Sequence, residues 1–146
     1  MKMIFYLVIG NILHLISYLT PKSSAIWIFG SHGGREFADN SKYLYNYIRH
    51  NHPEIKAIWI TKNAVLCEKL KKDGHNVFMC NSLKGIWYSC RAKFGMTCHG
   101  MHDLNRMASG RIKIIQAWHG IPMKPVLLSD PKESEILKRK KIHLQS

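Results

Sequence analysis

The sequence lacks paired cysteines, internal repeats and low-complexity linkers. Without repeats or linkers, its 146 residues are most simply one domain, large enough to bury a core. Cys98-His99 followed by His102 resembles a metal motif, but no C-x-x-C partner accompanies it, so we expect no metal site. All four cysteines lie in or beside apolar stretches, which favours buried thiols in a reducing cytoplasm.

Acidic side chains are also scarce. Nine Asp and Glu residues stand against 22 Lys and Arg, a formal net charge of +13. Such an excess attracts polyanions: nucleic acid, anionic lipid headgroups or a phosphate-rich substrate. The basic residues are spread along the chain, apart from a run at 138–141, so composition alone does not choose among these partners.

The N-terminal segment, residues 1–22, is predicted to be a membrane-associating helix. Its apolar part, Met3 to Leu19, is about the shortest length that crosses a bilayer. On a helix, Asn11, His14 and Ser17 would share one side, and the opposite side would be apolar, which suits a helix lying in the membrane interface. The apolar side would hold Phe5, Val8, Ile9, Ile12, Ile16 and Leu19.

Two other interpretations of this segment stay open. A signal peptide could be cut at residues 23–25, but cleavage there would fall on the first strand. A helix packed on its own domain is the other. The preferred prediction is a peripheral contact with the cytoplasmic face of the cell membrane.

From residue 25 onward, strand and helix patterns alternate. The expected strands lie at 25–31, 55–61, 75–80, 93–99 and 112–118, and the expected helices at 39–52, 64–74, 82–92 and 130–144. Asp39 is a plausible N-cap for the first of these helices, and Gly74 closes the second. This alternation predicts a Rossmann-like α/β domain over residues 25–146, with a parallel sheet covered by helices on both faces. Ligands of such sheets bind at the carboxyl ends of the strands.

The loop after the first strand, "GSHGGREF", is rich in glycine. Gly30, Gly33 and Gly34 would let the backbone approach a ligand, and such turns often hold phosphate through backbone N–H groups. The spacing is not G-x-G-x-x-G. The alternative is a tight turn whose glycines adopt positive φ.

The loop after the last strand, "WHGIPMK", places His119 at the same edge. Gly120 would allow a sharp exit, and Pro122 would suit the first turn of a helix whose N-terminus favours an anion. Lys124 would add a positive charge there, and His119 could accept a proton near neutral pH. This arrangement suits transfer of a phosphate-linked group, whereas the alternative is a histidine hydrogen-bonded within a turn.

The chain resembles a known family, the CDP-glycerol glycerophosphotransferases of bacterial wall teichoic acid synthesis. The matching pieces are "WIFGS", "FADNSKYLYNYI", "IKAIWIT", "SLKGIWYSCRAKF" and "IIQAWHGIPMKPV", in the family's order. They span roughly residues 26 to 126. The most specific matches are the run 39–42 and the run from Trp118 to Gly120 with Pro122 and Lys124.

The resemblance implies two Rossmann-type domains facing each other across a cleft, the GT-B arrangement. Members move glycerol phosphate from CDP-glycerol onto a lipid-linked polyol phosphate acceptor at the cytoplasmic membrane face and release CMP. His119 would be the base that activates the acceptor hydroxyl for attack on the β-phosphate. Neither a metal nor another cofactor is implied. The candidate substrate- or phosphate-binding residues are Gly33, Gly34, Asp39, Asn40, Gly120 and Lys124.

The family's second, donor-binding domain has no counterpart in this sequence. A fragment, a shortened reading frame or one half of a split enzyme with a separate C-terminal half would each explain this. The alternatives are a non-catalytic module that binds the acceptor or an anionic membrane surface, and one half of a GT-B glycosyltransferase. Nucleic acid is not expected as a partner, because no recognition motif accompanies the positive charge.

Overall fold

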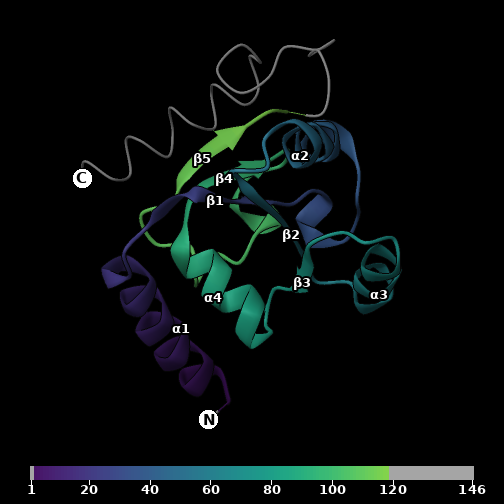
Figure 1. Ribbon diagram of the computed structural model, residues 1–146. Helices are drawn as coiled ribbons and strands as arrows, with labels where there is room; N and C mark the ends of the chain where they lie inside the picture. The colour runs from purple at the N-terminus through teal and green to yellow at the C-terminus, as the bar shows by residue number, and fades with distance from the viewer. Residues whose placement is uncertain (1, 119–146) are drawn as a thin grey trace, which may run out of the picture.

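The computed structural model describes residues 2–118, with side chains from residue 8 onward (Figure 1). Eleven elements occur in this part of the chain. They are α1 (Lys2–Leu19), β1 (Ser23–Phe29), the 3-10 helix η1 (His32–Gly34), α2 (Asp39–Asn51), β2 (Lys56–Thr61), α3 (Ala64–Lys72), β3 (Val77–Met79), α4 (Leu83–Arg91), β4 (Ala92–Thr97), the 3-10 helix η2 (Met101–Asp103) and β5 (Lys113–Gln116). The helix expected at 130–144 lies outside the described residues.

The five strands form one parallel sheet in the order β3-β2-β1-β4-β5. β1 is central, and its Ile28 and Phe29 point to opposite faces, as successive strand residues do. Phe29 belongs to a core cluster with residues of α2 and α3, and Ile28 to a second cluster that Tyr88 of α4 packs against. The predicted α/β fold with helices on both faces is therefore confirmed.

Local sequence explains most of the helix ends. Asn63 and Ser82 cap α3 and α4 by accepting hydrogen bonds from the N–H groups of Leu66 and Gly85, at 3.2 and 3.1 Å. Gly74 has a φ of 73° just after α3, as expected for a helix-ending glycine.

The prediction that Asp39 caps α2 is wrong. Ala38 occupies the N-cap position, and Asp39 is the first residue of the helix, with a φ of 58°. Its carboxylate is turned away from the helix N–H groups because it pairs with His32 of the preceding loop. A contact made outside the helix therefore prevails over the local capping preference.

Helix α1 lies beside α4 (Figure 1), and a narrow stripe of it packs against the segment between η2 and β5. Gly10 contacts Met107, and the buried Ser17 Oγ accepts a hydrogen bond of 2.8 Å from the N–H of Gly110. Packing on its own domain, one of the three interpretations, therefore applies to this stripe. The expected facing is reversed at Ser17, which is buried. From residue 8 onward, Leu13 is half-buried and the other large apolar side chains of α1 are exposed: Val8, Ile9, Ile12, Leu15, Ile16, Tyr18 and Leu19.

Within residues 2–118, no helix is long and apolar enough to cross a membrane. The predicted interfacial position of α1 is a separate matter, which rests on its exposed apolar side.

All four cysteines are free and buried, as the sequence predicts. Burial raises the pKa of the Cys67, Cys80 and Cys90 thiols. These three thiols thus remain protonated well above neutral pH.

Candidate functional site

Two short loops meet at the carboxyl edge of the sheet. The loop after β1 contains η1, the loop after β4 contains η2, and the two 3-10 helices contact each other. Gly30 lies where they approach most closely, since a Cβ built on it would come within 2.1 Å of the Asp103 carbonyl oxygen. Only glycine fits this position.

A buried carboxylate, that of Asp103, joins the two loops. Its Oδ1 accepts a hydrogen bond of 2.7 Å from the N–H of Gly33, in the β1 loop. Its Oδ2 accepts bonds of 2.9 and 2.8 Å from the N–H groups of Cys98 and His99, in the β4 loop. The side chain has no solvent exposure, so these three donors are the partners that offset the loss of its hydration. Asp103 thereby fixes the two loops relative to each other.

The glycine-rich turn takes its shape from Gly33 and Gly34, with φ values of 65° and 80°. The tight-turn interpretation of these glycines is therefore confirmed. Their N–H groups are already used, that of Gly33 by Asp103 and that of Gly34 by the Ser31 carbonyl oxygen, 2.8 Å away. In this conformation neither N–H is available to a phosphate, and the phosphate-binding role of the two glycines stays a prediction.

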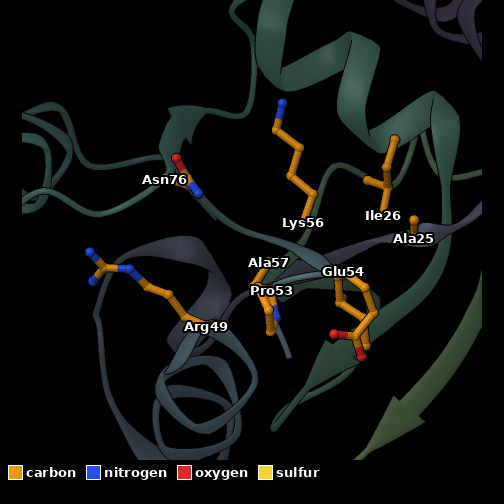
Figure 2. Close-up of a pocket in the computed structure, with 9 residues that line it drawn as sticks. Ala25, Ile26, Arg49, Pro53, Glu54, Lys56, Ala57 and Asn76 are labelled. Carbon is orange, nitrogen blue, oxygen red and sulfur yellow. The ribbon is translucent and has the colours of Figure 1, made fainter. Parts of the chain in front are cut away.

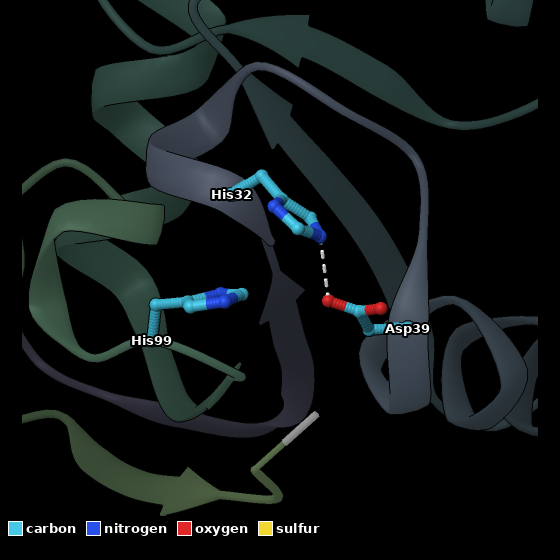
Figure 3. Close-up of side chains that lie close together, drawn as sticks. All are labelled: His32, Asp39 and His99. Carbon is cyan, nitrogen blue, oxygen red and sulfur yellow. Dashed lines mark ion pairs between the residues drawn. The ribbon is translucent and has the colours of Figure 1, made fainter. Parts of the chain in front are cut away.

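His32, Asp39 and His99 lie together at the site (Figure 3). His32 Nε2 is 2.7 Å from Asp39 Oδ2, and the rings of His32 and His99 are 4.6 Å apart between centroids. One ligand atom from each of the three residues lies within 4.8 Å of the others. Among the described residues, this is the one group of three with the spacing for a metal ion.

The first turn of α2 also holds the end of β5. Asn40 Nδ2 donates hydrogen bonds to the carbonyl oxygens of Ala117 and Trp118, at 3.1 and 2.9 Å. Trp118, the last described residue, has a φ of 57°. Asn40 therefore fixes the backbone that leads directly into His119. His119, Gly120 and Lys124 lie outside the described residues, and their roles stay predictions.

Sequence reasoning missed His32, His99 and Asp103. His32 lies inside the glycine-rich loop, and His99 lies in the run that resembles a metal motif. The sequence therefore shows both histidines but not that they lie next to each other. The spacing suggested His102 as the neighbour of His99, but the structure brings His99 to His32 instead. No local pattern indicates that Asp103 contacts the loop after β1, because its partner Gly33 in that loop is 70 positions away.

The opposite edge of the sheet holds a separate open depression of about 420 Å³. It is lined by residues at the amino ends of β1 and β2, including Ala25 and Lys56, together with Arg49 of α2 (Figure 2). Parallel α/β sheets bind ligands at the carboxyl ends of their strands. The loop cluster around Asp103 is therefore the preferred site.

The fold and the polar groups at its carboxyl edge define a parallel α/β domain, a class of proteins with many activities. Comparison with known proteins shows which family within this class the chain belongs to. Residues 12–145 match the family described as CDP-Glycerol:Poly(glycerophosphate) glycerophosphotransferase. The chain belongs to this family, as the resemblance seen in the sequence predicts.

Three curated relatives are teichoic acid poly(glycerol phosphate) polymerases. The protein from Staphylococcus epidermidis is 29% identical over 66% of this chain. Those from Bacillus subtilis and Bacillus spizizenii are 27% and 28% identical over 77% and 80% of it. The aligned regions make up only 13%, 15% and 29% of these relatives.

Solved structures of the wall teichoic acid polymerase TagF share the fold. One superimposes with a TM-score of 0.58 at 19% identity, and covers 94% of this chain but 36% of its own. A TagF variant soaked with CDPG gives a TM-score of 0.59 at 18% identity, with the same coverage.

Proposed function

We propose that this chain forms one wall of a two-domain glycerophosphotransferase of the GT-B type. The reaction transfers glycerol phosphate from CDP-glycerol to a lipid-linked polyol phosphate acceptor and releases CMP. The family membership and the TagF structure soaked with CDPG support this substrate. Because the relatives are three or more times longer than the matched region, the second wall comes from a further domain.

The observation that carries the proposal is the pair of hydrogen bonds from Asn40. They hold the last two residues before His119 against the start of α2, at the edge where a parallel sheet binds its ligand. A general base needs a fixed position relative to the hydroxyl that it deprotonates. Asn40 thus acts by positioning the segment of the base.

In this proposal, His119 accepts the proton of the acceptor hydroxyl, which attacks the β-phosphate of CDP-glycerol. Gly120 and Lys124 follow the base and bind phosphate oxygens. Asp39 and the Gly33-Gly34 turn, in the loop after β1 and the start of α2, are the other candidate contacts for a phosphate group.

The decisive assay is CMP release from CDP-glycerol in the presence of bacterial membranes that carry the acceptor. The chain is assayed alone and mixed with the unmatched C-terminal part of the S. epidermidis polymerase. We expect release in the mixture only, and at least a hundredfold loss with His119→Ala. Asn40→Ala should lower the rate about tenfold, because the base stays but its segment is no longer fixed. Release that survives His119→Ala would overturn the assignment of the base. A nucleotide sugar consumed in place of CDP-glycerol would favour the glycosyltransferase alternative.

We further propose that α1 lies on an anionic membrane surface at the cytoplasmic face. Its support is the exposed apolar side of the helix, where Ile12 and Ile16 are 54% and 52% exposed, combined with the net charge of +13. An amphipathic helix of this kind inserts its apolar side between headgroups while basic residues contact anionic lipid.

Vesicle co-sedimentation tests this position of α1. Wild-type chain should pellet with phosphatidylglycerol vesicles, and the double variant Ile12→Glu/Ile16→Glu should bind at least fivefold more weakly. The matched control is Asn11→Glu/His14→Glu, which adds the same two carboxylates at exposed polar positions of the same helix. Equal losses in the two doubles would mean that charge alone drives binding, and that the apolar side is not inserted. Strong vesicle binding without CMP release in the mixture would favour a non-catalytic binding module.

A further inference from the structure

We propose that His32, Asp39 and His99 form a binding site for a divalent first-row transition metal, with Zn²⁺ as the simplest occupant. Metal binding here can be measured without the proposed transfer reaction. The sequence indicated no such site because its three ligands come from three separate segments: the β1 loop, the first turn of α2, and the β4 loop.

The donor set selects the class of metal. Two imidazole nitrogens and one carboxylate oxygen suit zinc and its neighbours, whereas Mg²⁺ and Ca²⁺ prefer oxygen ligands alone. Three protein ligands would leave a position open for water or a phosphate oxygen, as in catalytic zinc sites. Glu36 adds a second carboxylate 3.9 Å from His32 Nε2.

The distances require only small movements of side chains. Ligand atoms that bind one zinc ion at about 2.1 Å lie roughly 3.4 Å from one another. The three ligand atoms here lie within 4.8 Å, and the His32–Asp39 contact of 2.7 Å is a hydrogen-bond distance. To bind one metal ion, these two ligand atoms would move slightly apart. None of the three side chains is fully buried, although the Asp39 Oδ2 atom itself is.

The backbone beneath the ligands is fixed before any metal binds. Asp103 accepts hydrogen bonds from the N–H of Gly33, next to His32, and from the N–H of His99 itself. His32 and Asp39 both adopt positive φ, at 47° and 58°. Non-glycine residues keep this conformation at a cost in free energy, and such residues cluster at functional sites. Here the two strained residues aim their side chains at each other.

A second histidine–carboxylate pair on the same chain provides the matched comparison. His52 Nδ1 lies 3.0 Å from Glu54 Oε1 on the surface, between residues two positions apart. Among residues 2–118, no third side chain joins this pair in a group with the spacing for a metal ion. It has the chemistry of the His32–Asp39 pair without the third ligand.

The test is a titration of the untagged full chain with Co²⁺, followed by visible absorption, and with Zn²⁺ in competition with a chromophoric chelator. We expect one tight site per chain, weakened at least tenfold by each of His32→Ala, Asp39→Asn and His99→Gln. The controls His52→Ala and His102→Gln should bind within twofold of wild type. Circular dichroism checks that each variant is folded.

Equal affinity in the three site variants and wild type would overturn the proposal, as would an equal loss in His52→Ala. If a site variant fails to fold, a Zn²⁺ titration of the wild-type chain followed by NMR tests the proposal instead. With ¹⁵N-labelled histidine, Zn²⁺ should shift the imidazole resonances of two histidines and leave the other seven unchanged. Shifts spread evenly over all nine would mean adventitious surface binding and refute the site.

Discussion

Removal of the Asp103 carboxylate should strongly destabilise this fold. Its carboxylate accepts three backbone hydrogen bonds and is wholly buried. A hydrogen bond to a charged group contributes about 1.5–3 kcal/mol, and a buried donor left unsatisfied costs about 1–3 kcal/mol. Because the β1 loop is partly exposed, water can reach the Gly33 N–H after substitution, so the three losses do not add fully. We expect Asp103→Ala to lower the free energy of unfolding by about 4 kcal/mol.

Asp103→Asn should be milder, and it separates shape from charge. The amide has nearly the same size but one oxygen, which can serve either the Cys98 and His99 donors or the Gly33 donor. The expected loss is about 2 kcal/mol, because one N–H then faces an NH₂ group. For a chain of this length, about 3 °C in Tm accompanies each kcal/mol. The midpoints should therefore fall by about 12 °C for Ala and about 6 °C for Asn.

Urea unfolding measures the free energies and thermal unfolding the midpoints, both followed by circular dichroism, with the exposed Asp73→Asn as the control. The control should lie within about 0.5 kcal/mol of wild type. If both Asp103 variants do so as well, the carboxylate does not hold the loops together. If Asn costs as much as Ala, the negative charge matters more than the number of acceptor atoms.

Three further substitutions test other contacts, each by urea unfolding. Gly30→Ala places a Cβ against the carbonyl oxygen at the end of η2. The two loops must then shift, which should cost about 3 kcal/mol. An unchanged urea midpoint would show that the loops move freely. Ser17→Ala leaves the Gly110 N–H without its acceptor and should cost about 1–2 kcal/mol; no cost would mean that α1 is not held there. Burial and the nearby Arg49 guanidinium lower the pKa of His75, so the unfolded chain binds this proton more readily than the folded one. His75 therefore does not affect the free energy of unfolding above its ordinary pKa of 6.5, and it lowers that free energy as the pH falls below this value. His75→Gln should thus flatten the decline of stability between about pH 7 and pH 5. An equal slope of stability against pH in both proteins would contradict the lowered pKa.

The elements could be predicted from the sequence because their signals are local. A strand expected at 25–31 is observed as Ser23–Phe29, and a helix expected at 82–92 as Leu83–Arg91. Each depends on the period of its apolar residues and on glycine or capping residues within a few positions. The positive φ of Gly33 and Gly34 could also be predicted, because a tight turn with positive φ favours glycine.

The site could be predicted only in part, because its contacts join distant segments. The carboxyl-edge rule selected the loop after β1, which contains His32, but nothing near residue 32 indicates that His99 will lie beside it. The same long-range contact explains the error at Asp39. A carboxylate at a helix start normally caps the helix, and only the position of His32 reveals that this one is used elsewhere.

The sheet order has a consequence for how the chain acquires its structure during synthesis. β1 is the central strand, yet both of its neighbours come later: Ile26 aligns with Lys56 of β2, and Trp27 with Phe94 of β4. At ribosomal speeds of about 5–20 residues per second, β1 waits seconds for its first partner and longer for its second. During that interval, the nascent chain carries an apolar strand and an apolar helix side by side with nothing to cover them. The apolar side chains of β1 are therefore open to aggregation until β2 and β4 have been made.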